Sequence, residues 1–301
     1  MTGPIAAGPI ADCLAGTISP EVALARLLLA GATPDAIERS LQDHPSDAPR
    51  WAAMTRLLKS RRSALDALAS EVQATVAQHD ASGTTPADGV ARIAAFFDHA
   101  VQHSPEASVA LYSLGDPVIL AAATAEIVAW LASQDLLRPG MDVLDLGCGI
   151  GRIAAALAPR CRSVLGLDVS AGMVAEARRR HATLPGVRFA QTDGQGLDAL
   201  PDQAFDLIVA VDCFPYIVQA GAADRHVAGT ARILRPGGAL AVLNLSYRED
   251  PAADLADARA WSKSHGLTLD LNTAATTPFT LWDGTAYVLL AAPSPLGRGS
   301  G

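Results

Sequence analysis

Short apolar runs alternate with longer segments of helical or loop character after residue 140. The helical or loop segment that follows each run is about 10 to 25 residues long. The runs lie at 142–146, 163–167, 186–190, 205–211 and 238–244. This alternation predicts βαβ units, and therefore an α/β fold with a parallel sheet that has helices on both faces. Pro236, Gly237 and Gly238 are expected to form a tight turn that leads into the fifth strand.

Two further strand candidates, 267–271 and 285–291, are joined by a loop that is too short for a crossover helix. Strands joined in this way pair antiparallel. The sequence therefore predicts a seven-stranded, mostly parallel sheet with an antiparallel edge strand, preceded by an α-helical N-terminal region.

Helix-start signals are frequent before residue 140. Ser19-Pro20-Glu21 and Thr33-Pro34-Asp35 each place an N-cap residue before a proline and an acid, so helices are expected to begin there. Two more helices are expected at about 88–103 and about 117–132. The first dozen residues are rich in Gly and Pro and are expected to be frayed.

One long amphipathic helix is expected at 51–76. Its apolar positions have heptad-like spacing. They are Met54, Leu58, Leu65, Leu68 and Val72. Two interpretations of this stripe stay open, namely a dimerisation seam and packing within a local helical bundle.

The change of character along the sequence predicts three parts. Residues 1–115 are expected to form a helical region that caps the substrate or dimerises. Residues 116–292 are expected to form the ligand-binding domain, and residues 293–301 a disordered tail.

Composition argues against several classes of function. The chain has 301 residues and a formal net charge of -8, so sequence-independent binding of nucleic acid is not expected. No uncharged apolar run reaches the roughly 18 residues of a membrane span, and the N-terminus lacks the basic segment of a signal peptide. The four cysteines show neither CxxC pairs nor Cys/His ligand spacing, so neither a disulfide framework nor a metal site is expected. The sequence indicates a cytoplasmic protein.

A glycine-rich loop follows the first apolar run, directly behind an acid. In the stretch VLDLGCGIGR, Asp145 precedes Gly147, Gly149 and Gly151. Glycines allow strained backbone torsions and let backbone amides approach a ligand closely. Because parallel α/β sheets bind ligands at the carboxyl ends of their strands, this loop is the first candidate for a binding site.

Two classes of ligand compete for this loop. Dinucleotide-binding loops have the spacing GxGxxG, and Arg152 stands here at the position of their third glycine. The carboxylate of Asp145 would repel a pyrophosphate and attract a cation. The loop therefore favours S-adenosylmethionine, a nucleoside with an ammonium and a sulfonium, over NAD.

Acids also follow the next two expected strands. Asp168 lies where a carboxylate can accept hydrogen bonds from both ribose hydroxyls of a nucleoside. Asp193 could accept a bond from an adenine amino group, or could cap a following turn. Acids at three consecutive strand ends are a more specific signal than one glycine loop.

Residues 140 to about 292 resemble the class I S-adenosylmethionine-dependent methyltransferases of the small-molecule type. The matching stretches stand in the order of that family and at similar intervals. They are VLDLGCGIGR, GLDVSAGMVAEAR, TDGQGL, FDLIVAVDCFPYI, RILRPGGALAV and WDGTAYVLLA. The resemblance implies a Rossmann-like sheet and S-adenosylmethionine as the cofactor.

The resemblance also implies roles for single residues. The loop glycines would bound the methionine part, Asp145 would help to hold its ammonium, and Asp168 would bind the ribose. Met173 suits either an adenosine contact or core packing, and Asp212 suits either the sulfonium end of the pocket or the N-cap of the helix after Pro215. The residues implied at the cofactor are Asp145, Gly147, Cys148, Gly149, Gly151, Asp168, Val169, Met173, Asp193, Gly194 and Asp212.

Methyl transfer from a sulfonium is an in-line displacement, so aligning donor and acceptor is the main task and can supply about 7–11 kcal/mol. A general base is needed only when the acceptor arrives protonated. Tyr216 and His226 are candidates, and His226 suits core packing as well. Tyr112 is expected either in a lid over the donor or at a domain junction. The stretch DCFPY stands in place of Asn-Pro-Pro-Tyr, which disfavours methylation of nucleic-acid bases.

The predicted function is transfer of a methyl group to an O, N or C atom of a small organic molecule. A non-catalytic relative with a regulatory or assembly role is the alternative, and an NAD-dependent oxidoreductase is the third hypothesis. A homodimer through the N-terminal helices is a further expectation. The sequence does not indicate which molecule accepts the methyl group.

Overall fold

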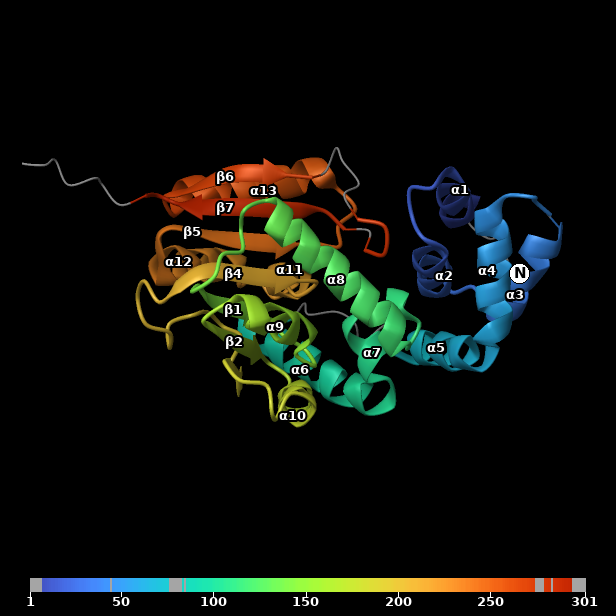
Figure 1. The fold of residues 1–301 in the computed structure, drawn as a ribbon, viewed down its shortest axis with the longest axis horizontal. Coiled ribbons are helices and arrows are strands. Elements are labelled where there is room, and N and C mark those ends of the chain that lie inside the picture. The colour runs from blue at the N-terminus through green and yellow to red at the C-terminus, as the bar shows by residue number, and fades with distance from the viewer. Residues whose placement is uncertain are drawn as a thin grey trace, which may run out of the picture. The chain divides into compact units, whose positions relative to one another are not determined.

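Seven strands form one mixed sheet in the computed structural model, in the order β3-β2-β1-β4-β5-β7-β6 (Figure 1). The structure describes residues 7–43, 45–75, 83, 85–273, 279–282 and 284–293. The strands are β1 (Asp142–Leu146), β2 (Ser163–Asp168), β3 (Val187–Gln191), β4 (Phe205–Val211), β5 (Leu234–Leu243), β6 (Leu267–Asn272) and β7 (Ala286–Ala291). The first five run parallel, and β7 lies antiparallel between β5 and β6. The predicted seven-stranded, mostly parallel fold is confirmed, including the antiparallel pair at one edge.

The chain divides into two compact units that interleave in sequence. The first unit comprises residues 1–79, 99–130 and 277–283, and the second comprises residues 80–98, 131–276 and 284–301. The first unit thus continues beyond the predicted boundary at residue 115, and residues 80–98 belong to the second unit. Of the predicted tail, residues 294–301 lie outside the described residues.

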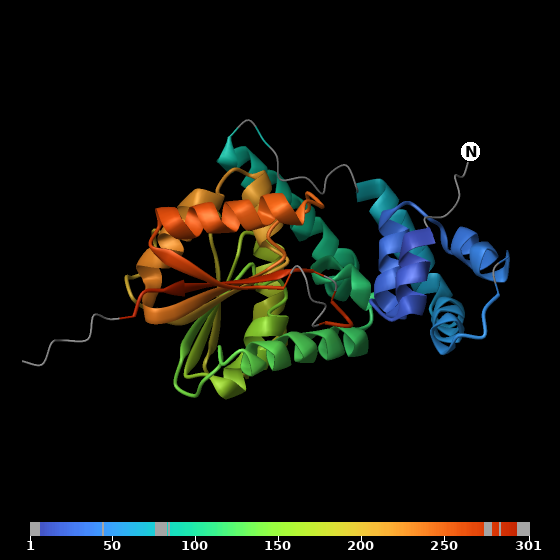
Figure 2. The same cartoon turned by 90° about the horizontal axis from the view of Figure 1, so that it is seen from above.

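Helices cover both faces of the sheet within the second unit (Figure 2). They are α9 (Arg152–Leu157), η3 (Ala158–Arg160), α10 (Ala171–Arg180), α11 (Phe214–Gln219), α12 (Ala223–Ile233) and α13 (Pro251–Ser264), with α6 (Pro86–His103) beginning in this unit. The central strand β4 is almost wholly apolar, so both of its faces can be buried between the helical layers.

The Pro-Gly-Gly segment was expected to precede the fifth strand, and this expectation is wrong. The strand already begins at Leu234, which pairs with Phe205, and pairing then resumes at Ala239 opposite Leu207. Pro236 therefore lies inside a bulge of β5, where an extra stretch of chain is accommodated without ending the strand.

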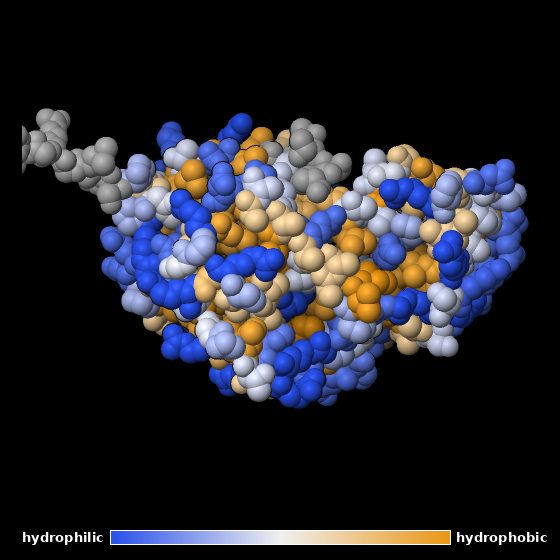
Figure 3. Space-filling model, in the orientation of Figure 1, coloured by the Kyte–Doolittle hydropathy of each residue, from blue (hydrophilic) through white to orange (hydrophobic). Residues whose placement is uncertain are grey.

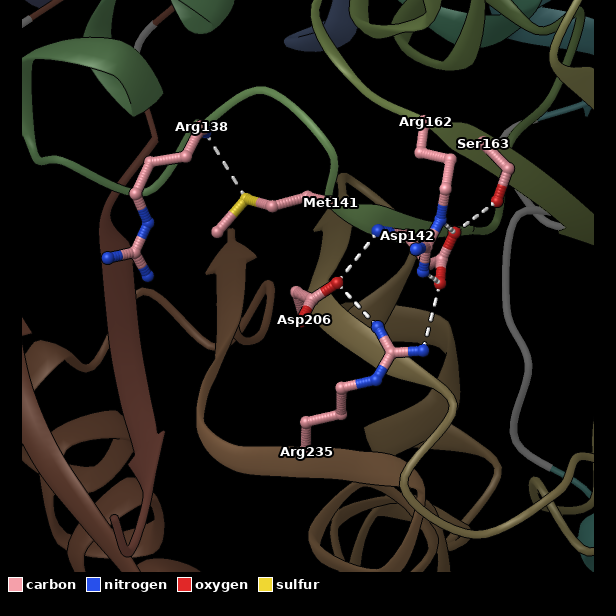
Figure 4. A network of polar contacts seen from close by, with 7 residues as sticks. All are labelled: Arg138, Met141, Asp142, Arg162, Ser163, Asp206 and Arg235. Carbon is pink, nitrogen blue, oxygen red and sulfur yellow. Dashed lines mark hydrogen bonds and ion pairs between the residues drawn. The ribbon is translucent and has the colours of Figure 1, made fainter. Parts of the chain in front are cut away.

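A network of ion pairs joins the amino ends of four strands (Figure 4). Arg235 on β5 donates to Asp206 on β4 at 2.5 Å and to Asp142 on β1 at 2.9 Å. Ser163 on β2 donates to the same Asp142 carboxylate at 2.7 Å. The guanidinium of Arg162 holds the pKa of Asp142 well below its usual range. This network fixes the sheet at the end opposite to the glycine loop.

The first unit is helical. Its elements are α1 (Ala7–Ala15), α2 (Pro20–Leu29), α3 (Pro34–Asp43), α4 (Pro49–Ser60), α5 (Arg62–Thr75), α7 (Pro105–Val109), η2 (Leu111–Ser113) and most of α8 (Pro117–Ser133). Ser19 caps α2 as predicted, because its Oγ accepts from the Val22 amide at 3.2 Å. The expectation that the first dozen residues are frayed is wrong from Ala7 onward, where α1 begins.

The single helix predicted at 51–76 is two helices, broken at Arg61. Arg61 leaves the helical conformation, and its guanidinium forms an ion pair with the buried Asp116 at the start of α8. The apolar stripe continues across the break. Its buried members are Met54, Leu58, Leu65 and Leu68. Packing within a local bundle is therefore confirmed for this stripe, and a homodimer stays a prediction.

Hydrophilic residues occupy much of the face shown in Figure 3, with hydrophobic side chains between them. Large hydrophobic side chains that are exposed among the described residues are Leu14, Leu29, Val118 and Tyr247. Single exposed side chains of this kind are normal on a protein surface. Within the described residues, no helix combines the length and the apolar character needed to cross a membrane.

Candidate functional site

The order of the strands reverses beside β1. This strand lies between β2 and β4. After β1 the chain continues to β2 on one side of it, and after β4 the chain continues to β5 on the other side. In open α/β sheets such a reversal leaves a crevice in which ligands bind. The predicted glycine loop follows β1 at this point.

The three glycines of the loop have backbone torsions that favour glycine. The φ angles of Gly147, Gly149 and Gly151 are 69°, 52° and 81°. A Cβ atom on Gly147 would lie 2.2 Å from the Cβ of Cys213, and one on Gly151 would lie 2.7 Å from the Phe189 ring. The loop therefore needs glycine both for its conformation and for the close approach of its neighbours.

Asp168 joins the glycine loop to the turn after β2. Its Oδ2 accepts from the Gly149 amide at 2.8 Å, and its Oδ1 accepts from the Ser170 amide at 2.9 Å. The residue is only 8% exposed, and burial raises the pKa of its carboxyl. Two strand ends are thus bound together through one buried carboxylate.

Asp145 lies beneath the same loop. Its side chain is buried, and its Oδ2 accepts from the Ala154 amide of α9 at 2.9 Å. Burial raises the pKa of this carboxyl to about 7, and the nearby charge of Asp168 acts in the same direction. A cationic ligand at this loop would favour the ionised forms of both acids.

Asp98 is a polar residue of this region that the sequence did not single out. It lies on α6, and its Oδ1 accepts from the Ser170 hydroxyl at 2.6 Å and from the Gly172 amide at 2.7 Å. Ser170 in turn caps α10 by accepting from the Met173 amide at 3.0 Å. Asp98 therefore fixes the turn that carries Asp168, through partners more than 70 residues away in the sequence.

The residues expected near the adenosine lie along the ends of β2 and β3. A Cβ atom on Gly194 would lie 2.5 Å from Val169, so these two loops are in close contact. Asp193 accepts from the Gln195 amide at 3.0 Å, which is the turn cap considered as its alternative role. Met173 is buried, as its core-packing interpretation expects. Contacts of these residues with an adenosine stay predictions.

Asp212 follows β4 and is held in a left-handed conformation with a φ of 57°. Its carboxylate accepts from Asn244, which has a φ of 67° at the end of β5, and lies 3.8 Å from the Arg152 guanidinium. Non-glycine residues in the left-handed region cluster at functional sites. Its N-cap interpretation is wrong, because Cys213 is the N-cap residue of α11 and no side chain caps that helix.

Tyr216 lies on α11 beside other aromatic side chains. Its ring centroid is 5.4 Å from that of Phe97 and 5.6 Å from that of Tyr247, and the two tyrosine hydroxyls are hydrogen bonded. Burial raises the pKa of Tyr216. The phenol is therefore neutral at physiological pH and can donate or accept a hydrogen bond, but a phenolate base at Tyr216 is disfavoured.

The other two candidates, His226 and Tyr112, are on other elements of the chain. His226 is buried in α12, with its Nδ1 2.9 Å from the carbonyl of Ala222, the N-cap residue of that helix, and burial lowers its pKa. These contacts are those of a core histidine. Tyr112 lies in η2 of the first unit and is buried. Its role in a lid stays a prediction.

Asn244, Tyr247 and Arg152 gather around Asp212 but were not predicted as site residues. The Tyr247 hydroxyl donates to the Asp212 carbonyl at 3.4 Å. In the sequence, Arg152 stands at the position of the third glycine of a dinucleotide-binding loop, and no role in the site was expected for it. A local pattern could not identify Asn244 or Tyr247, because the pairing of β4 with β5 brings them to Asp212.

Comparison with known proteins finds similarity in the α/β part of the chain. The methyltransferase domain family matches residues 143–238. Similar curated proteins include a trans-aconitate 2-methyltransferase from Methylobacterium nodulans, which is 40% identical over 40% of this chain and 45% of its own length. An S-adenosyl-L-methionine-dependent Diels-Alderase, iccD, from Talaromyces variabilis is 31% identical over 43% of each chain. The chain thus spans less than half the length of these relatives.

Among solved structures, phosphoethanolamine N-methyltransferase 1 from Haemonchus contortus is similar in fold. The TM-score is 0.54 at 16% sequence identity, and the match covers 72% of this chain and 51% of the other. Residues 143–238 thus match the methyltransferase domain family, and the sheet that they help to form has the Rossmann-like fold of this N-methyltransferase.

Proposed function

We propose that the second unit binds S-adenosylmethionine and that the protein transfers a methyl group to an O, N or C atom of a small organic molecule. One observation carries the proposal. Two buried acids flank the same glycine loop where the strand order reverses: Asp168 accepts from the Gly149 amide of the loop, and Asp145 precedes the loop and accepts from Ala154 in the helix that follows it. A site of this kind suits a ligand with a positive charge and a nucleoside.

The residues of the loop fit this cofactor. The glycines allow the left-handed torsions of the loop, and we propose that Asp145 supplies negative charge for an ammonium and that Asp168 supplies a carboxylate for the ribose hydroxyls. We assign the adenosine to Val169, Met173, Asp193 and Gly194, and the end that carries the methyl group to Asp212. Cys148 contributes backbone to the loop, and burial raises the pKa of its thiol well above the usual value.

S-adenosylmethionine, when bound, supplies a methyl group on an activated leaving group. The task left to the chain is to align the acceptor and to exclude water. We place the acceptor beside Asp212, Tyr216 and Tyr247, because their polar atoms are joined by hydrogen bonds next to the donor loop. Tyr216 would orient the acceptor as a neutral phenol.

Small molecules are the proposed acceptors because similar proteins are named for them. They include trans-aconitate and 2-methyl-6-phytyl-1,4-hydroquinone. The net charge of -8 makes nucleic acid a poor partner. We also infer a cytoplasmic location, which suits the four free thiols of Cys13, Cys148, Cys161 and Cys213. The helical N-terminal region is proposed to cap the substrate or to form a homodimer.

A second function is suggested by the relative named as an S-adenosyl-L-methionine-dependent Diels-Alderase. A domain of this kind could bind the cofactor without transferring its methyl group. A regulatory or assembly role would have the same binding and no turnover. NAD-dependent oxidation stays the third hypothesis.

Thermal unfolding with S-adenosylhomocysteine, with NAD and without ligand tests the binding part of the proposal. We expect only S-adenosylhomocysteine to raise the melting temperature, because a ligand that binds the folded state stabilises it. A rise with NAD alone would show that the cofactor is wrongly assigned. Incubation with methyl-labelled S-adenosylmethionine and a panel of small carboxylic acids, phenols and amines then tests transfer. Binding without labelled product across the panel would favour the second function.

A further inference from the structure

Two histidines and a glutamate gather on the surface of the first unit. Glu71 lies on α5, and His99 and His103 lie in the last turns of α6. One possible ligand atom from each residue lies within 4.8 Å of the other two. The His99 Nε2 is 3.6 Å from the Glu71 Oε1, and the two imidazole centroids are 4.2 Å apart.

The spacing along α6 explains why the imidazoles meet. Residues four apart on a helix lie one above the other on the same face. The His103 Nδ1 is 3.0 Å from the His99 carbonyl. A carbonyl can only accept, so Nδ1 carries the proton and the neutral ring presents the lone pair of Nε2. A backbone carbonyl commonly fixes the tautomer of a metal-binding histidine in this way.

The donor set and the distance between His99 and Glu71 suit a late divalent metal. Imidazole nitrogens and a carboxylate oxygen are ligands of Zn²⁺, at about 2.0–2.2 Å from the ion. Tetrahedral geometry with such bonds places ligand atoms about 3.4 Å apart. The observed 3.6 Å between His99 and Glu71 is close to this value. The side chain of His99 is 52% exposed, so an ion can reach this imidazole from solvent, and the Glu71 Oε1 atom lies buried beside it.

We propose that Glu71, His99 and His103 bind one Zn²⁺ ion, with water in the remaining position. The ion would connect α5 to the end of α6 within the first unit. This site revises the expectation of no metal, which rested on cysteine spacing and on histidines near cysteines. The glutamate lies on a different helix from the histidines, so the site has no compact sequence motif from which it could be predicted.

Calorimetric titration of the full chain tests the proposal. The protein is first stripped with a chelator and then titrated with Zn²⁺ in a buffer that does not bind metal. We expect one ion per chain in the wild type. The variants His99→Asn and His103→Asn should each lose more affinity than the 10–100-fold typical of outer-shell partners, because each removes a direct ligand. Glu71→Gln should also bind more weakly.

His265→Asn is the matched control. His265 lies 2.8 Å from Asp224 and forms a histidine–acid pair in the second unit, and among the described residues this pair is not part of a group of three possible ligands. This variant should bind Zn²⁺ as the wild type does. Circular dichroism and melting temperatures of the metal-free proteins check that all variants fold alike. The site would be overturned if the wild type showed no saturable binding, or if His99→Asn and His103→Asn bound Zn²⁺ as tightly as the wild type. His99 and Glu71 would then be an ordinary surface pair.

Discussion

Asp145 makes the stability of the ligand-free protein depend on pH. Its pKa is about 7 in the folded state, against about 3.9 for an ordinary aspartate. Between these values the folded protein binds more protons than the unfolded chain, so this group lowers stability as pH rises from about 4 to about 7. The slope is at most roughly 1.4 kcal/mol per pH unit.

The variant Asp145→Asn should remove this contribution, because the amide oxygen can still accept from Ala154 but carries no charge. Urea unfolding at pH 5 and pH 7.5 measures the effect. We expect the free energy of unfolding of the variant, relative to that of the wild type, to be higher at pH 7.5 than at pH 5. An equal difference between the two proteins at both pH values would contradict the raised pKa.

Gly147 is expected to tolerate no side chain. Its positive φ costs an alanine about 1–2 kcal/mol, and the added Cβ would lie 2.2 Å from Cys213. Gly140 has a similar φ of 84° and no atom within 4 Å of an added Cβ. In chemical denaturation, Gly147→Ala should therefore cost about 1–3 kcal/mol more than Gly140→Ala. Equal costs would show that the approach of Cys213 does not constrain the loop.

At the scale of elements, α6 is expected to position Asp168, the acid proposed to bind the ribose, through Asp98. Asp98→Ala removes the acceptor for Ser170 and Gly172, which should cost about 1 kcal/mol of stability and weaken binding of S-adenosylhomocysteine. Asp98→Asn keeps an acceptor oxygen and should restore most of the binding. Calorimetry on both variants measures the effect. Equal affinity of Asp98→Ala and the wild type would limit Asp98 to a stabilising role.

Sequence pattern predicted the elements wherever local signals decide them. The strands β1 and β4 have the predicted bounds, and Ser19 caps its helix as expected. The break at Arg61 was missed because its cause, the ion pair with Asp116, is a tertiary contact. The bulge in β5 was read as a turn because its Pro-Gly-Gly composition suits both.

At the scale of the whole molecule, the ion-pair network and the proposed binding loop lie at opposite ends of the sheet. The network around Arg235 lies at the amino ends of the strands, and the glycine loop lies at their carboxyl ends. Arg235→Gln should cost about 1–3 kcal/mol, because it removes hydrogen bonds to two carboxylates. Affinity for S-adenosylhomocysteine, measured by calorimetry, should stay within about twofold of the wild type, because mutations at distant sites without shared partners have independent effects. A parallel loss of affinity would mean that the two ends are coupled.

The candidate site could be predicted in part. The acids and glycines that follow β1 and β2 stand in local motifs, so Asp145, Gly149 and Asp168 were found in the sequence. Asp98 and Asn244 carry no motif, and the fold alone brings them to Ser170 and Asp212. The division into units that interleave also follows from contacts between distant segments, so a single boundary at residue 115 could not describe it.

The central claim is that buried acids around a glycine loop hold a nucleoside with a positive charge. Calorimetric titration of S-adenosylhomocysteine and of NAD into the wild type and into Asp168→Ala tests it most directly. We predict one molecule of S-adenosylhomocysteine per chain, no binding of NAD, and a loss of at least about tenfold in Asp168→Ala, from one or more charge-assisted hydrogen bonds. Binding of NAD in place of S-adenosylhomocysteine, or unchanged affinity in a folded Asp168→Ala protein, would contradict the claim.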